Sequence, residues 1–131
     1  MQRIGMAGLV AAAALTAGPA ASGAGQAVGQ ATGPKGYVVA QLTVHDPAKF
    51  GQYAPQVPAI LAKYGGHYIV RGGGITPVEG EAPSGRVVII EFPSVEAARA
   101  FNASPDYLAI APLRHASAEG PVFIVEGVPP K

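Results

Sequence analysis

The chain has 131 residues, enough for one domain, with 49% hydrophobic residues, 13% charged residues and a formal net charge of +1. It contains no cysteine, which excludes disulfides, cysteine-ligated metals and thiol catalysis. The charge is near neutral and no run of basic residues occurs, which excludes the positive surface that nucleic-acid binding requires.

Residues 1–24 have the order of a secretory signal peptide. Arg3 gives a basic start, an apolar run extends from Ile4 to Ala17, and small residues follow Pro19, so that cleavage after any of residues 21–24 fits. The apolar run is too short for a comfortable membrane span, although a retained N-terminal anchor is the alternative. Cleavage removes Arg3, which reduces the nine Lys and Arg to eight, equal to the eight Asp and Glu. We therefore expect a periplasmic or secreted protein that no longer contacts the membrane.

Residues 25–35 are rich in Gly, Ala and Gln and have almost no large apolar side chain. Such a segment cannot bury enough apolar surface to order itself, which predicts a flexible linker. The folded domain is predicted to span residues 36–128, with a tail at residues 129–131.

The first half of the domain is predicted to be a strand, an interrupted helix and a second strand. Residues 36–44 alternate with one wholly apolar face, and Asp46-Pro47 starts a helix whose apolar stripe continues to Tyr64. Pro55 and Pro58 predict a kink or a break in that helix. Gly65 and Gly66 end it, and residues 67–71 form the second strand.

The second half adds two strands and two helical segments. Three glycines at residues 72–74 predict a bulge, residues 75–79 are expected to extend the second strand, and residues 80–85 to turn the chain. Residues 86–92 form the third strand, and residues 121–126 the last. Ser94 is predicted to cap a helix through Phe101, and Ser104-Pro105 to start another through about Ser117, with Leu108 and Ala111 facing inward.

This order, β-α-β-β-α-β, predicts an α+β, ferredoxin-like fold with a four-stranded antiparallel sheet in the order 4-1-3-2 and helices on one face. The other face would remain apolar and uncovered. An apolar sheet surface of this size is typical of an interface, so we expect a homodimer in which two sheets pack face to face into a dimeric α+β barrel.

Alternation along the strands places polar side chains on that uncovered face. His67 and Arg71 share it on the second strand, and Glu91 and Gln41 join it from the third and first strands. Tyr37 and Tyr107 are expected at the rim of the resulting chamber. Arg71 would hold a carboxylate or enolate oxygen, and His67 would transfer a proton. The alternative is an Arg71–Glu91 pair that only satisfies itself within an apolar interface.

No other chemistry is indicated by the remaining motifs. The three histidines, His45, His67 and His115, have no metal-ligand spacing, and residues 72–74 are no phosphate loop, since neither Lys-Ser/Thr nor a helix follows them. We therefore predict neither a metal nor a cofactor.

Three blocks of sequence resemble DUF1330, a family of small bacterial proteins of unknown function. They are GYVVAQLTVHDPAKFGQY from Gly36, VPAILAKYGGHYIVRGG from Val57, and RVVIIEFPSVEAARAFNASPDY from Arg86 with the APLR that ends at Arg114. The resemblance covers residues 35–128 and implies a fold similar to the dimeric α+β barrels, which include small monooxygenases and isomerases. It also marks Arg114 as a candidate ligand-binding residue.

Two functions follow from these expectations. In the first, a small organic acid or aromatic ligand is bound, or transformed without a cofactor, in the dimer barrel by His67, Arg71 and Glu91 with Tyr37, Gln41, Tyr107 and Arg114. In the second, the protein is a non-enzymatic dimer whose sheet face serves assembly alone. Fold similarity does not choose between them.

Overall fold

The computed structural model describes residues 33–131 of the chain. The predicted signal peptide, residues 1–24, and the predicted linker up to residue 32 lie outside the described residues. The folded part begins directly with an antiparallel sheet. Its strands are β1 (Gly36–Val44), β2 (His67–Arg71), β3 (Arg86–Phe92), β4 (Ala118–Glu119) and β5 (Val122–Glu126).

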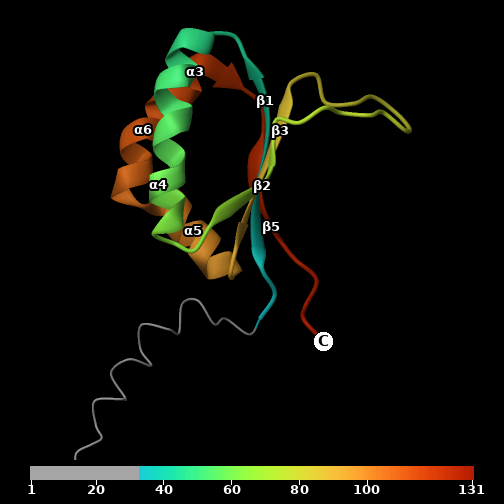
Figure 1. The fold of residues 1–131 in the computed structure, drawn as a ribbon, viewed down its shortest axis with the longest axis vertical. Helices are drawn as coiled ribbons and strands as arrows, with labels where there is room; N and C mark the ends of the chain where they lie inside the picture. The colour runs from blue at the N-terminus through green and yellow to red at the C-terminus, as the bar shows by residue number, and fades with distance from the viewer. Residues whose placement is uncertain (1–32) are drawn as a thin grey trace, which may run out of the picture. The chain divides into compact units, whose positions relative to one another are not determined.

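The sheet runs in the order β2-β3-β1-β5, and the short β4 pairs with the end of β1. All helical segments cover the same face of the sheet (Figure 1). They are α3 (Pro47–Tyr53), the 3-10 turn η3 (Ala54–Gln56), α4 (Val57–Ala62), α5 (Val95–Ala103) and α6 (Pro105–Ser117). The predicted ferredoxin-like α+β fold is confirmed, with β5 as its fourth main strand. Within residues 33–131 no helix has both the length and the apolar character needed to cross a membrane.

The two prolines break the first helix as predicted. Asp46 caps α3 by accepting a hydrogen bond from the Lys49 backbone N–H at 3.0 Å. Pro55 then lies in η3 and Pro58 in the first turn of α4, and each lacks the N–H that a continuous α-helix would use. The result is three short segments in place of one long helix.

The core lies between the sheet and the helices. Val38, Ala40 and Leu42 point into it from β1, and Ile90 and Phe92 from β3. The helices contribute Phe50, Ile60 and Leu61 with aromatic rings from α5 and α6. The prediction for Leu108 is wrong, because this residue is 56% exposed, whereas the buried residues of α6 are Tyr107, Ile110, Ala111 and Ser117.

Strand β2 contains a bulge at an unexpected position. Tyr68 pairs with Ile90 of β3, but the next pair along the strands is Val70 with Ile89, so Ile69 is an extra residue. The sequence predicts the bulge at residues 72–74 instead. It also predicts a strand over residues 75–79, which the structure places in no strand. A bulge reverses the facing of every later residue in the strand, and this reversal decides where Arg71 lies.

Candidate functional site

Three of the predicted site residues meet on the open face, the sheet face opposite the helices. Glu91 of β3 lies in register between Tyr37 of β1 and His67 of β2. The Tyr37 hydroxyl donates to Glu91 Oε2 at 3.0 Å, and His67 Nε2 lies 3.2 Å from Glu91 Oε1. The hydrogen bond to Glu91 raises the pKa of the Tyr37 hydroxyl. Glu91 thus has a partner for each carboxylate oxygen.

Gln41 is on the same face but apart from this cluster. Its register partner on β3 is Val87, while Glu91 pairs with Tyr37. The prediction that Gln41 joins Glu91 is therefore wrong, because Gln41 lies four residues along β1 from Tyr37, which is two side-chain repeats on the same face.

Arg71 lies on the opposite face from the one predicted. The bulge at Ile69 turns Arg71 toward the helices, where it pairs in register with Val88 and its guanidinium carbon lies 4.3 Å from the centre of the Tyr68 ring. Arg71 and Glu91 are thus on different faces of the sheet. Two predictions for these residues are therefore wrong. Arg71 and Glu91 do not share a site on the open face, and they do not form an ion pair with each other.

Tyr107 and Arg114 also belong to the helix side. Both residues come from α6, and both line a cavity between the sheet and the helices of one chain. The cavity has a volume of about 50 Å³, and its walls are mainly apolar. Its polar lining comes from the five elements α3, β2, β3, α5 and α6, which provide Tyr53, Tyr68, Arg71, Arg86, Asn102, Tyr107 and Arg114.

Among residues 33–131, none of the three arginines of the cavity has an acidic partner. The ion pairs that the structure shows within residues 33–131 join other residues: His45 with Glu119, Lys63 with Asp106, and His67 with Glu91. Arg71 and Arg86 instead lie over aromatic rings, and the Arg86 guanidinium carbon is 5.4 Å from the centre of the Phe50 ring. Ring contacts of this kind leave the N–H edges of a guanidinium free to bind an oxyanion.

Arg86 carries the clearest sign of an unmet interaction. Its Nε is buried and has no hydrogen-bond partner among the described residues. A buried N–H without an acceptor costs about 1–3 kcal/mol, more when the group is charged. Gly72 has φ +70°, and a Cβ placed there would lie 2.8 Å from one Arg86 Nη atom, so this glycine leaves room for the guanidinium.

Two buried tyrosines form the other polar group of the cavity. The Tyr53 and Tyr107 hydroxyls are 2.8 Å apart, and Arg114 Nε donates to the Tyr107 hydroxyl at 3.2 Å. Burial, followed by the neighbouring Tyr107, raises the pKa of the Tyr53 hydroxyl far above its ordinary value of 10.0. Burial also raises the pKa of Tyr68, against the lowering effect of Arg71 and Arg86. The Tyr53 and Tyr68 hydroxyls are therefore neutral hydrogen-bond donors at physiological pH.

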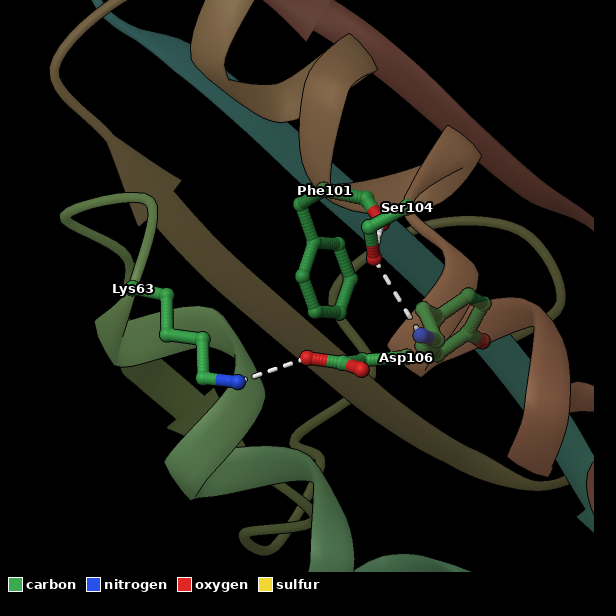
Figure 2. A network of polar contacts seen from close by, with 5 residues as sticks. Lys63, Phe101, Ser104 and Asp106 are labelled. Carbon is green, nitrogen blue, oxygen red and sulfur yellow. Dashed lines mark hydrogen bonds and ion pairs between the residues drawn. The ribbon is translucent and has the colours of Figure 1, made fainter.

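A small polar network fixes the start of α6 and with it Tyr107. The buried Ser104 hydroxyl donates to the Phe101 carbonyl at 2.8 Å and accepts from the Tyr107 backbone N–H at 3.2 Å (Figure 2). One residue before Tyr107, Asp106 accepts from Lys63 Nζ at 2.6 Å, which ties the end of α4 to α6. Tyr107 is thus held by groups that precede it in the chain: Ser104 accepts from its backbone N–H, and Asp106 ties the start of α6 to α4.

The free energy of unfolding is expected to fall as the pH rises above about 10. Tyrosines in the unfolded chain ionise near 10.0, whereas the raised pKa keeps the Tyr53 and Tyr68 hydroxyls protonated in the folded state. Their contribution to the free energy of unfolding is complete below pH 10 and is lost as the pH rises toward the folded-state pKa. Each residue lowers the free energy of unfolding by no more than about 1.4 kcal/mol per pH unit. Urea unfolding between pH 8 and 11 measures the slope of the free energy of unfolding against pH. Tyr53→Phe should reduce it, and an unchanged slope in that variant would contradict this account.

Sequence reasoning missed four polar residues of the cavity, Tyr53, Tyr68, Arg86 and Asn102. Arg86 shares the helix-facing side of β3 with Val88 and Ile90, so the alternation that placed these two inward could also have placed Arg86. Tyr53 belongs to the apolar stripe of α3, and nothing in the stripe shows that its hydroxyl meets Tyr107.

Comparison with known proteins gives a family and a fold. Residues 35–128 match the family described as Domain of unknown function (DUF1330). The structure of RPA0582, a protein of unknown function from Rhodopseudomonas palustris, is 15% identical and similar at a TM-score of 0.60, over 74% of this chain and 85% of that chain. Its methylated form is 17% identical at the same TM-score, over 74% and 83% of the two chains. No protein with a curated function matches the sequence.

A more distant likeness is to SnoaB, a cofactor-independent oxygenase from Streptomyces nogalater, at 18% identity and a TM-score of 0.46, over 70% of this chain and 91% of that chain. A likeness this weak says nothing of activity in the present protein. The family match, in contrast, spans almost all of the described residues, and it confirms the resemblance of the three sequence blocks. The chain belongs to the DUF1330 family.

Proposed function

We propose that this protein binds a small organic acid in the cavity between its sheet and its helices. The observation that carries the proposal is the buried Arg86 Nε without a partner, beside two further arginines that no carboxylate neutralises within residues 33–131. A carboxylate accepts charge-assisted hydrogen bonds from guanidinium groups in one plane, which is the geometry that arginine side chains offer.

The size of the cavity favours short acids over aromatic ones. Its volume is about 50 Å³, whereas an engineered protein cavity that takes up benzene measures about 150 Å³. The apolar walls, which include Val38, Val57 and Val122, suit a short aliphatic chain. Among the ligand classes expected from the sequence, the small organic acid is therefore the one that fits.

The same walls favour binding over acid–base catalysis. The cavity lining that residues 33–131 provide includes no Asp, Glu or His. Arginine does not give up its proton in proteins, and burial raises the pKa of Tyr53, so neither can serve as a general base near neutral pH. What this site offers an oxyanion is a set of hydrogen-bond donors.

Calorimetric titration of propanoate into the purified protein tests the proposal. We expect saturable binding of one propanoate per chain, and we expect propanamide, which has the same shape without the charge, to bind at least tenfold more weakly. Equal affinity for the acid and the amide, or no binding of either, would overturn it.

We also propose that two chains associate through their open faces. The support is the exposed apolar surface that this face presents, with Ile69 48%, Phe123 44% and Val125 45% exposed. The polar cluster on the same face is already satisfied within one chain, since Glu91 has Tyr37 and His67 as partners. Burying it in an interface therefore leaves no carboxylate oxygen unpaired.

Phe123→Glu is expected to convert the dimer into a monomer. Phe123 lies opposite Val39 in the sheet, so the substitution places a charge inside the proposed interface. Sedimentation equilibrium should give twice the mass of one chain for the wild type and the mass of one chain for the variant. Leu108→Glu, on the helix side and also exposed, should remain dimeric. A monomeric wild type, or a dimeric Phe123→Glu, would exclude this interface.

For the N-terminus, we propose export to the periplasm or the medium with cleavage after one of residues 21–24. The support is the order of basic, apolar and small residues over residues 1–24. Mass spectrometry of the protein recovered from cell fractions measures the new N-terminus, and a chain that keeps Met1 in every fraction would overturn this.

A further inference from the structure

We infer that the preferred ligand carries a second oxygen acceptor next to its carboxylate, as short 2-oxo and 2-hydroxy acids do. The inference rests on the proposed function and narrows its ligand class. It comes from the hydrogen-bond count of the Tyr53–Tyr107 pair, which lies in the wall of the same cavity as Arg86.

The Tyr53–Tyr107 pair has one more O–H donor than it has acceptors for. The two phenols bring two O–H groups, and their mutual hydrogen bond of 2.8 Å consumes one of them. Arg114 adds its own N–H, donated to Tyr107 at 3.2 Å, and accepts nothing. Whichever tyrosine donates to the other, one phenol O–H has no acceptor among residues 33–131.

This spare O–H is buried and is held in its place. Tyr53 is 8% exposed and Tyr107 is 6% exposed, so water reaches either side chain only slightly from outside. A buried hydroxyl without an acceptor is costly, which makes a ligand oxygen at this position favourable. The high pKa of Tyr53, caused first by burial, keeps the phenol a donor over the physiological range.

The cavity therefore offers two kinds of donor to one ligand. The guanidinium of Arg86 provides a charged donor, which a carboxylate satisfies, and the phenol pair provides a neutral one. A keto or hydroxyl oxygen accepts a hydrogen bond from a phenol without adding a second charge to an apolar cavity. A three-carbon acid with such an oxygen, pyruvate or lactate, remains within the size that the cavity favours.

The test compares pyruvate and lactate with propanoate, which has the same number of carbons and no second acceptor. We expect pyruvate and lactate to bind the wild-type protein at least tenfold more tightly than propanoate. Because a single Tyr→Phe substitution still leaves one phenol O–H in the pair, Tyr53→Phe and Tyr107→Phe should each retain a preference. The double variant Tyr53→Phe/Tyr107→Phe should bind all three acids within about twofold of each other, which a merely structural role of the pair would not produce.

The outcomes separate the two proposals. Equal binding of propanoate, pyruvate and lactate by the wild type would overturn the second acceptor and leave the small-acid site intact. If the double variant still prefers pyruvate and lactate to propanoate, the phenols are not the cause of the preference, and the inferred second acceptor is overturned as well. Absence of binding by all three acids would overturn the proposed function itself. The thermal unfolding of each variant confirms that it is folded. The paired removal of both hydroxyls leaves neither phenol without its partner, and Arg114 Nε, which donates to the Tyr107 hydroxyl, loses its acceptor in Tyr107→Phe and in the double variant alike.

Discussion

Arg86→Met is expected to make the ligand-free protein more stable and its binding of propanoate at least tenfold weaker. The substitution removes a buried guanidinium Nε that has no hydrogen-bond partner in the described part of the chain, and this relieves a penalty of about 1–3 kcal/mol. Methionine is flexible enough to fill the space, although the contact of the guanidinium with the Phe50 ring is lost, at about 0.5–1 kcal/mol. The net gain in the free energy of unfolding is about 1 kcal/mol, which corresponds to roughly 4–8 °C in Tm for a domain of this size.

The opposite signs of the two effects make this prediction specific. A residue retained for packing alone would lose stability when shortened, and a residue on the surface would change neither property. Arg99→Met, an exposed arginine of α5, is the matched control and should leave both the Tm and the propanoate affinity unchanged. Thermal unfolding and calorimetric titration of both variants measure the two quantities. A less stable Arg86→Met variant with unaltered affinity would show that Arg86 supports the fold and not a ligand.

Phe101→Ala is expected to lower the free energy of unfolding by about 3–5 kcal/mol, the usual cost of removing a fully buried phenylalanine ring. Phe101 is 1% exposed, and its ring centre lies 4.7 Å from that of Tyr107 and 5.4 Å from that of Phe92. Since Phe101 also lines the cavity, its removal enlarges the space beside the arginines. Benzoate should therefore raise the Tm of this variant and leave the Tm of the wild type unchanged.

Leu108→Ala provides the control for this substitution. Leu108 follows Tyr107 on α6 but is 56% exposed, so its truncation should change the free energy of unfolding by no more than about 0.5 kcal/mol. Urea unfolding measures both variants. A loss below about 1 kcal/mol in Phe101→Ala, or stabilisation of the wild type by benzoate, would contradict the assignment of this cavity as a small, well-packed site.

The fold was predictable because its signals are local. The alternation in β1 and β3, the Asp46-Pro47 and Ser104-Pro105 helix starts, and the prolines that interrupt the first helix each act on neighbouring residues. Together they define the order of the elements, and the ferredoxin-like arrangement follows from that order.

The site was predictable only in part because a single extra residue changes the result. Strict alternation is correct for His67 and Glu91, which lie together on the open face. It fails at Arg71, because the bulge at Ile69 depends on how β2 pairs with β3 and not on the residues of β2 alone. The meeting of Tyr53 with Tyr107, 54 residues later in the chain, likewise depends on the packing of α3 against α6.

The most direct test of the central claim is the side-chain Nε–H resonance of Arg86 in an NMR titration with propanoate, assigned by its loss in Arg86→Lys. If the acid lies between the sheet and the helices, this resonance shifts with a saturable, single-site dependence, while the resonances of His67 on the open face do not move. If the His67 resonances shift and that of Arg86 does not, the ligand binds to the open face, and the cavity within one chain is not the site.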